Sequence, residues 1–215
     1  MSDTEDTEEF FKTNSIFKKK CVIIEDLTKE DEIIINSIID IISDLFINIC
    51  EENKTKKTTN NFLLKSFTNK NIPSITIKDY LLRLSKYSKV NESTIILILI
   101  YIDRICNIKR FFLTYYNIHK IILASFILAI KYNEESYYSM LYYSKLGGVS
   151  LSELKNLESE FLILIGYKLF VEEKLYDKYY NDLMSLKIEE INDEENEEEY
   201  EEIEDNSIEQ NKEGV

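Results

Sequence analysis

The 215-residue sequence predicts an all-α fold, and three observations carry that prediction. One proline and four glycines are too few for the turns of a β-sandwich or for the phosphate loops of a Rossmann-type fold. Apolar residues make up 44% of the chain, enough for one sizeable core, and they recur at helical spacing. Three candidate capping boxes mark the places where helices begin.

The first predicted helix begins after Thr28, which forms a candidate capping box with Asp31. Through residues 33–49, apolar side chains recur every three or four positions, so an amphipathic helix to about residue 51 is expected. The following segment, up to residue 71, is rich in Lys, Asn and Thr, which is typical of a loop.

Three more helices are expected before the tyrosine-rich part of the chain. The second follows a capping box of Thr76 and Asp79, and the third ends near Ile105. The apolar run 95–102 in this third segment also fits a buried strand, but its polar flanks and the lack of bounding turn residues favour a helix. The fourth, residues 115–132, is apolar nearly all round and is therefore expected at the centre of the fold.

Two helices remain in the last part of the fold. Residues 133–146 are expected to hold one short helix, which Gly147 and Gly148 end. A capping box that starts at Ser150 opens a longer helix, and Gly166 is its natural C-cap. Beyond it, an amphipathic Leu- and Tyr-rich stretch continues as a helical extension over residues 173–187.

The net charge of −14 is concentrated at the two ends of the chain. Residues 188–215 contain 14 acidic residues and a single base, Lys212, and are predicted to be a disordered acidic tail. Residues 1–20 are likewise expected to be a disordered acidic start, without the apolar segment of a signal peptide. The intervening residues 10–187 carry a net charge of only +4, too weak a basic character to predict nucleic-acid binding.

Several classes of site are disfavoured by residue counts. The three cysteines, Cys21, Cys50 and Cys106, form neither a C-x-x-C pair nor a disulfide framework, which favours a reducing, intracellular compartment. The single histidine, His119, excludes most His-based metal sites and triads, and it is expected to cap or pack a helix. No phosphate-loop, zinc or calcium motif is found, so no enzyme activity and no cofactor are expected. The longest apolar runs fall short of the roughly 20 residues that span a bilayer, so no membrane contact is expected.

Short motifs then appear in order along the predicted helices, and together they resemble the cyclin box. They are Tyr101-Ile-Asp-Arg104, Ala129-Ile-Lys-Tyr-Asn-Glu-Glu135 and Leu157-Glu-Ser-Glu-Phe-Leu162. The stretch 135–148, with Asp79-Tyr-Leu-Leu-Arg83 and Asn117-Ile-His119, resembles the P/U-type cyclins, which include the fungal phosphate-signalling cyclins. The resemblance covers about residues 73–172, a single cyclin box, and leaves the N-terminal helix and loop (28–71) and the acidic ends outside.

The resemblance implies a five-helix bundle around a central third helix, and a non-catalytic subunit that binds and activates a cyclin-dependent serine/threonine protein kinase by positioning its C-helix. Lys131 and Glu158 match the Lys/Glu pair that meets the kinase in this family. Tyr132, Glu134 and Tyr138 are expected at the same contact. The expected structural residues of the box are Asp79, Tyr101, Asp103, Arg104, Gly147 and Gly148.

The residues alone also allow simpler interpretations of these positions. Lys131 fits a lysine that the helix dipole favours near a helix C-terminus, and Glu158 fits a solvated helix residue. Asp103 with Arg104 fits a surface pair, but an acid that follows eight apolar residues is expected to bond inward. Pro73 stands where many cyclins have an arginine, so the arginine-anchored brace of mitotic cyclins is expected to be absent.

Two other functions compete with the kinase regulator. A cyclin-fold adaptor in transcription would need a basic face and usually two repeats, whereas one box is found and the body is nearly neutral. An enzyme would need a catalytic constellation that the sequence does not offer. We therefore expect a kinase heterodimer without nucleic acid or membrane contact, in the cytoplasm or nucleus; which kinase, and whether it serves nutrient signalling or cell division, stays open.

Overall fold

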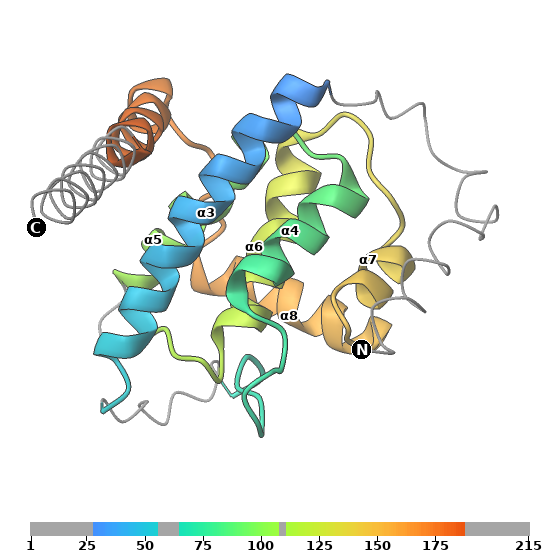
Figure 1. Cartoon of the computed structure of the whole chain (residues 1–215). Coiled ribbons are helices and arrows are strands. Elements are labelled where there is room, and N and C mark those ends of the chain that lie inside the picture. Colours follow the sequence, from blue (N-terminus) through green and yellow to red (C-terminus); the bar gives the residue numbers. More distant parts are fainter. Residues whose placement is uncertain (1–27, 56–64, 108–110, 188–215) are drawn as a thin grey trace, which may run out of the picture. The chain divides into compact units, whose positions relative to one another are not determined.

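A computed structural model describes residues 28–55, 65–107 and 111–187, and every regular element in these ranges is a helix (Figure 1). The predicted all-α fold is therefore confirmed for the part of the chain that is described. The expectations for the acidic start, for Cys21 and for the acidic tail lie outside these residues. The described chain divides into two units, residues 1–172 and 173–215, and helices α3 to α8 belong to the first.

Helix α3, Lys29–Glu52, begins where the capping box predicts. The hydroxyl of Thr28 accepts a hydrogen bond from the Asp31 backbone N–H at 3.1 Å, and the Asp31 carboxylate accepts one from the Thr28 backbone N–H at 3.0 Å. One face of the helix packs against α4 and α5 and is fully buried at Ile38, Ile42 and Phe46. The local sequence thus sets where the helix starts, and the apolar spacing sets which face enters the core.

By length and composition alone, helix α3 is long and apolar enough to cross a membrane, although its runs of consecutive apolar residues are short. The core helix of a globular protein satisfies the same criteria of length and composition, and 44% of its 18-residue apolar window is buried inside the molecule. Because α3 packs on α4 and α5, its apolar face already has a partner in the bundle. Its length and composition are therefore weak evidence for a membrane span.

Helices α4, Ile77–Ser88, and α5, Glu92–Cys106, follow in the order predicted. The hydroxyl of Thr76 accepts from the Asp79 backbone N–H and caps α4. The apolar run that also fitted a strand lies wholly inside α5, where most of its side chains are buried. A hydrogen bond of 3.1 Å from the Ser125 hydroxyl to the Ile98 carbonyl joins α5 to the next helix.

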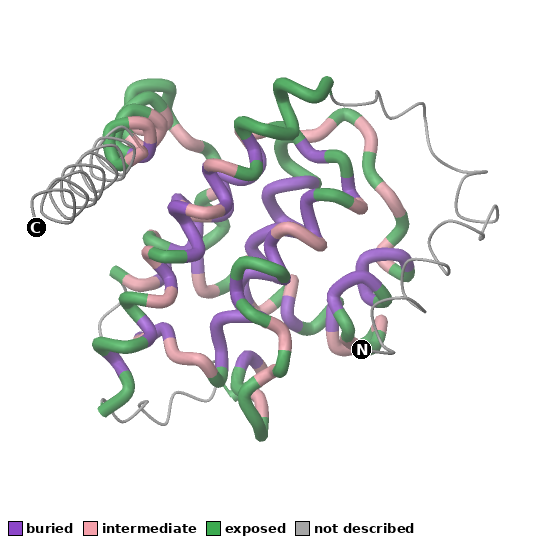
Figure 2. Tube along the Cα trace, in the orientation of Figure 1, coloured by how far each residue is buried: buried purple, intermediate pink, exposed green. Residues whose placement is uncertain are grey.

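Helix α6, Ile118–Asn133, is the central element, and it packs against α4, α5 and α8. Every residue from 121 to 130 is buried, as Figure 2 shows along this helix. The helix starts three residues later than expected, because the side chain of Asn117 bonds to the loop before it. Its Oδ1 accepts from the Thr114 N–H at 2.8 Å and its Nδ2 donates to the Phe112 carbonyl at 2.9 Å.

Two helices complete the first unit, α7, Met140–Leu146, and α8, Leu151–Leu164. Serine hydroxyls cap both, Ser139 for α7 and Ser150 for α8. The last helix ends as predicted, because Gly166 has a φ of 65°, a left-handed conformation that glycine adopts without strain. In the second unit, residues 173–187 form a further helix, as the amphipathic pattern predicts.

Candidate functional site

The side chains of Lys131 and Glu158 meet where the last turn of α6 passes the middle of α8. The Lys131 ammonium donates a hydrogen bond to the Glu158 carboxylate and forms an ion pair with it. The two side chains are 33% and 20% exposed, so the pair is partly desolvated yet still reachable from solvent. The structure therefore brings together two residues 27 positions apart that the motifs had singled out.

Tyrosines at the end of α6 and in the segment that follows it differ in exposure. Tyr132, next to Lys131, is 48% exposed and lies in the same helical turn. Tyr138 is half-buried and stacks on the ring of Tyr142 with ring centroids 4.3 Å apart. Tyr137 is 45% exposed, whereas Tyr142 and Tyr143 are buried, so the tyrosine-rich stretch divides between surface and core.

Leu141 is an exposed apolar residue that sequence reasoning missed. It is 44% exposed on α7, while Tyr142, Tyr143 and Leu146 of the same helix are buried. The helical spacing of those three residues could have identified the outward face, but α7 is only seven residues long and its periodicity is weak evidence.

The carboxylate of Glu134, which is half-buried, is bonded to other residues of the chain. Its two oxygens accept hydrogen bonds from the backbone N–H and the side-chain amide of Asn91, each at 3.0 Å. A third hydrogen bond comes from the hydroxyl of Thr94. The side chain thus ties the end of α6 to the start of α5.

Two of the residues expected to be structural, Tyr101 and Arg104, bond to the segment that follows α8. Tyr101 is fully buried, and its hydroxyl donates to the Leu169 carbonyl at 2.9 Å; burial raises the pKa of this hydroxyl. The Arg104 guanidinium donates to the carbonyls of Lys168 and Phe170 at 2.6 and 2.9 Å. These bonds pin the segment that follows α8 to the end of α5.

Asp103 lies differently from its neighbours. It is exposed, and its carboxylate accepts from the Asn107 side chain at 3.2 Å in the same helix end. The expectation that Asp103 bonds inward is wrong, because the inward positions of this turn belong to Tyr101, Ile102 and Ile105. Asp79, also expected to be structural, lies in the cap of α4, where its carboxylate accepts from the Thr76 hydroxyl at 2.7 Å.

The two glycines after α7 have distinct roles. A Cβ on Gly147 would lie 2.5 Å from Cδ2 of Leu123, so any larger residue here would require the Leu123 side chain or the end of α7 to shift. The Gly147 carbonyl also accepts a hydrogen bond of 3.1 Å from the Tyr80 hydroxyl. Gly148 has a φ of 70°, the left-handed conformation in which other residues are strained.

His119 is a packed residue, as expected. It is 6% exposed, its Nε2 lies 3.0 Å from the Ile75 carbonyl oxygen, and its ring meets the Tyr80 ring edge-on. Burial lowers its pKa and favours the neutral ring. Burial also disfavours the charged thiolates of Cys50 and Cys106 and so raises the pKa of each thiol to about 12, so neither is an activated nucleophile. Among the described residues, no three His, Cys, Asp or Glu side chains are arranged to hold a metal ion.

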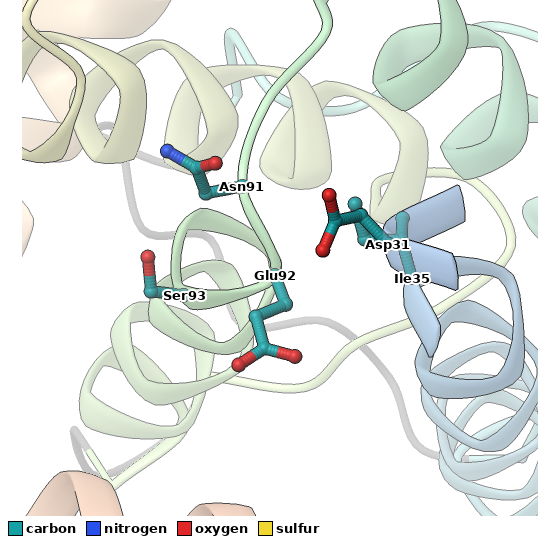
Figure 3. Close-up of a pocket in the computed structure, with 5 residues that line it drawn as sticks. All are labelled: Asp31, Ile35, Asn91, Glu92 and Ser93. Atoms are coloured by element: carbon teal, nitrogen blue, oxygen red, sulfur yellow. The ribbon is translucent and has the colours of Figure 1, made fainter. Parts of the chain in front are cut away.

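A surface cleft of about 300 Å³ lies between the start of α3 and the start of α5 (Figure 3). Its lining residues are Asp31, Ile35, Asn91, Glu92 and Ser93. The hydrogen bond from the Thr28 hydroxyl lowers the pKa of Asp31, whose carboxylate belongs to the capping box of α3. The lining offers two carboxylates and the Ser93 hydroxyl, and the Asp31 carboxylate is already bonded to Thr28.

Comparison with known proteins identifies the family. The family model described as Cyclin matches residues 33–169, which is more than half of the chain and includes most of helix α3 and all of helices α4 to α8. The chain belongs to the cyclin family. The match includes most of helix α3, so the expectation that this helix lies outside the resemblance is wrong.

Individual relatives support the P/U-type assignment. The chain is 37% identical to Cyclin-U2-1 of Arabidopsis thaliana over 114 residues, which are 53% of this chain and 51% of the relative. It is 36% identical to the PHO85 cyclin-like protein psl1 of Schizosaccharomyces pombe over 121 residues, 55% and 50% of the two chains. It is 34% identical to PHO85 cyclin-7 of Saccharomyces cerevisiae over 128 residues, 54% and 45% of the two chains. The chain thus spans about half the length of these relatives, and the predicted P/U-type resemblance is confirmed.

Proposed function

We propose that this cyclin is a non-catalytic regulatory subunit that binds and activates a cyclin-dependent serine/threonine protein kinase. The observation that carries the proposal is the Lys131–Glu158 pair, partly desolvated at the surface beside the exposed ring of Tyr132. The names of two relatives, PHO85 cyclin-7 and the PHO85 cyclin-like protein psl1, point to the same class of partner.

The proposed mechanism is selection of the active position of the kinase C-helix. A protein kinase is active only when its catalytic Lys–Glu ion pair is assembled, and that depends on where the C-helix lies. A partner that contacts the helix only in this position shifts the kinase towards activity. The Lys131 ammonium offers three donors, of which Glu158 accepts one, so it suits the backbone carbonyls at the end of a helix.

Two tyrosines, one at the end of α6 and one in the segment that follows it, supply apolar contact area. Tyr132 presents an exposed ring in the same turn, and Tyr138 presents a half-buried one that is held by Tyr142. Interfaces concentrate binding energy in aromatic side chains around a desolvated centre. We therefore assign kinase binding to Lys131, Glu158, Tyr132 and Tyr138. Glu134 supports the same turn of α6 through its hydrogen bonds to Asn91 and Thr94.

The proposal extends to the organisation of the chain and its setting. Helices α3 to α8 act together as the cyclin domain, and residues 173–187 follow it as an extension. The complex is an intracellular heterodimer in the cytoplasm or nucleus. It works without a cofactor and without contact to nucleic acid or membrane.

The test measures binding of the full chain to purified PHO85, the cyclin-dependent kinase in the names of the two yeast relatives, and activation of PHO85 towards a protein substrate. Lys131→Glu is expected to weaken binding by at least tenfold, while circular dichroism shows unchanged helical content. The fold should tolerate the change because a part-exposed ion pair contributes about 1 kcal/mol or less. Lys78→Glu is the matched control, since Lys78 also forms an ion pair, with Asp40 at 2.9 Å, but at the contact of α3 with α4.

A charge swap separates docking from a merely structural pair. The Lys131→Glu, Glu158→Lys variant restores opposite charges but leaves no donor at position 131. If the pair docks on the kinase, the swap stays as weak as Lys131→Glu; recovery of affinity would assign the pair to folding alone. Failure of the wild-type chain to bind PHO85 or any other cyclin-dependent kinase, together with a DNA or RNA mobility shift that weakens at higher salt, would favour the adaptor instead.

A further inference from the structure

Helix α5 begins without the cap that its sequence could provide. Asn91 is its N-cap residue, but the Asn91 side chain makes no capping hydrogen bond to the first turn. Thr94 stands at the third helical position, where a capping box has Glu or Gln, and its short side chain cannot reach back as those do. The first N–H groups of a helix have no partner within the helix, so a start of this kind needs an acceptor from elsewhere.

Glu134 supplies that acceptor from 43 positions further along the chain. Its Oε1 accepts from the Asn91 backbone N–H, the bond that the missing Glu of a capping box would make. The same carboxylate takes hydrogen bonds from the Asn91 amide and the Thr94 hydroxyl. Its negative charge also lies at the positive end of the α5 dipole, which stabilises this position.

The same contact fixes the end of α6. Glu134 is the C-cap of α6, and its own N–H donates to the Ile130 carbonyl at 2.9 Å. The preceding residue, Asn133, donates from its amide to the hydroxyls of Ser93 and Thr94, each at 2.9 Å. Both residues at this end of α6 are therefore bonded to the first turn of α5.

Lys131 and Tyr132 lie inside the turn that is held in this way. Helix ends open locally more readily than helix centres, and exposed residues such as these gain little support from core packing. The direction in which the two side chains point follows from the backbone of this last turn. The hydrogen bonds of Glu134 to Asn91 and Thr94, called here the α5–α6 tie, therefore fix the direction in which the Lys131 and Tyr132 side chains point.

We propose that Glu134 is a positioning residue. Its hydrogen bonds to the N-terminus of α5 hold the last turn of α6, and this turn orients Lys131 and Tyr132 for the kinase. The proposal rests on the proposed function, because the orientation matters only if these residues dock on a kinase. In this proposal Glu134 supports kinase binding indirectly and does not touch the kinase. The evidence is the three hydrogen bonds that its carboxylate accepts from within the chain.

Thr94 provides the decisive variant, because it is fully buried and cannot touch a partner. Thr94→Val keeps the shape of the side chain but removes the hydroxyl that bonds to Glu134. Glu134→Ala removes the tie from the other side, while Glu134→Gln keeps an oxygen for the Asn91 N–H and the Thr94 hydroxyl. Thr76→Val is the matched control, since it removes a capping hydroxyl from α4 and leaves the α5–α6 tie intact.

Two measurements are made on the full chain, affinity for purified PHO85 and hydrogen exchange of the free chain. Thr94→Val and Glu134→Ala should each weaken PHO85 binding about fivefold or more and speed amide exchange in residues 92–95 and 130–134. The loss of affinity in the double variant should be smaller than the sum of the two single losses, because both changes remove the bond between Thr94 and Glu134, and Thr94→Val additionally removes only the bond from Asn133. Glu134→Gln should keep most of the affinity, and Thr76→Val should lower stability without changing affinity.

The outcomes separate this proposal from the proposed function. Wild-type affinity in Thr94→Val and Glu134→Ala, with loss in Lys131→Glu, would overturn the positioning role and leave the docking site standing. Loss in both Glu134 variants with wild-type affinity in Thr94→Val would show that Glu134 touches the kinase directly, and would also overturn it. A wild-type chain that binds no cyclin-dependent kinase would overturn the proposed function, and the positioning role with it.

Discussion

Replacing Gly147 by alanine is expected to force helix α7 away from the central helix α6. The added Cβ would lie 2.5 and 2.7 Å from the two methyl carbons of Leu123 and 3.1 Å from the Tyr143 carbonyl oxygen. Leu123 is fully buried and cannot swing into solvent, whereas the Tyr143 carbonyl belongs to α7 itself and accepts the Gly147 N–H. The helices must separate, or the Leu123 side chain must leave its preferred rotamer.

The cost follows from two contacts at this point. Overpacking a well-packed core by one methyl group costs about 1–3 kcal/mol. A shift of α7 also disturbs the hydrogen bond from the Tyr80 hydroxyl to the Gly147 carbonyl, which contributes about 1 kcal/mol. Together they predict a loss of about 2–4 kcal/mol in the free energy of unfolding, or roughly 5–15 °C in Tm for a chain of this size.

Urea denaturation and calorimetry of the full chain measure this loss. Gly148→Ala is the matched control, because its Cβ meets only the end of the Arg83 side chain at 3.8 Å and the left-handed φ alone costs about 1–2 kcal/mol. Adding Leu123→Ala to Gly147→Ala makes room for the methyl group, so the two changes together should cost less than their sum. Strict additivity, or a Gly147→Ala variant as stable as Gly148→Ala, would refute the steric reasoning.

Three further predictions concern the core and its buried polar groups. Ile98→Asp should abolish the cooperative helical signal in circular dichroism, because Ile98 is 1% exposed and the new carboxylate would be buried unpaired; a soluble, folded variant would contradict its placement. Tyr101→Phe should lower the free energy of unfolding by about 1 kcal/mol in urea, since the Leu169 carbonyl loses its donor, and an unchanged midpoint would deny that bond a role in stability. Because burial lowers the pKa of His119 from 6.5, the unfolded chain takes up a proton that the folded chain resists, so stability should fall as pH drops below 6.5. His119→Gln should show a shallower decline between pH 7 and pH 5, and equal slopes would count against this source of pH dependence.

Local interactions made most of the fold predictable from sequence. A capping box joins residues only three positions apart. Thr28 with Asp31 and Thr76 with Asp79 therefore predict where their helices begin without any knowledge of the rest of the chain. Helical spacing identified α6 as central, because nearly every position along it is apolar. The start of α6 was misplaced because the Asn117 side chain bonds to the preceding loop, and nothing in the periodicity reveals that bond.

The site was less predictable, because its interactions join distant segments. The motifs selected Lys131 and Glu158, and the structure shows them paired. Glu134 belonged to the same motif, but its partners lie 40 and 43 positions earlier, and no sequence pattern links them. Asp103 shows the converse error, because an acid after an apolar run suggests an inward bond until the helix phase places it on the surface.

The position of the ion pair allows the proposed docking to be tested separately from folding. Glu158 follows Leu157, which is fully buried, while the Glu158 side chain remains 20% exposed. The apolar residues beneath the pair therefore supply the stability, and the pair itself adds about 1 kcal/mol or less. A substitution at Leu157 would alter docking by unfolding α8, whereas one at Glu158 would alter docking with the bundle intact. Only the second kind of variant tests the proposed kinase contact, which is why the charge swap of Lys131 and Glu158 decides more than any substitution in the core.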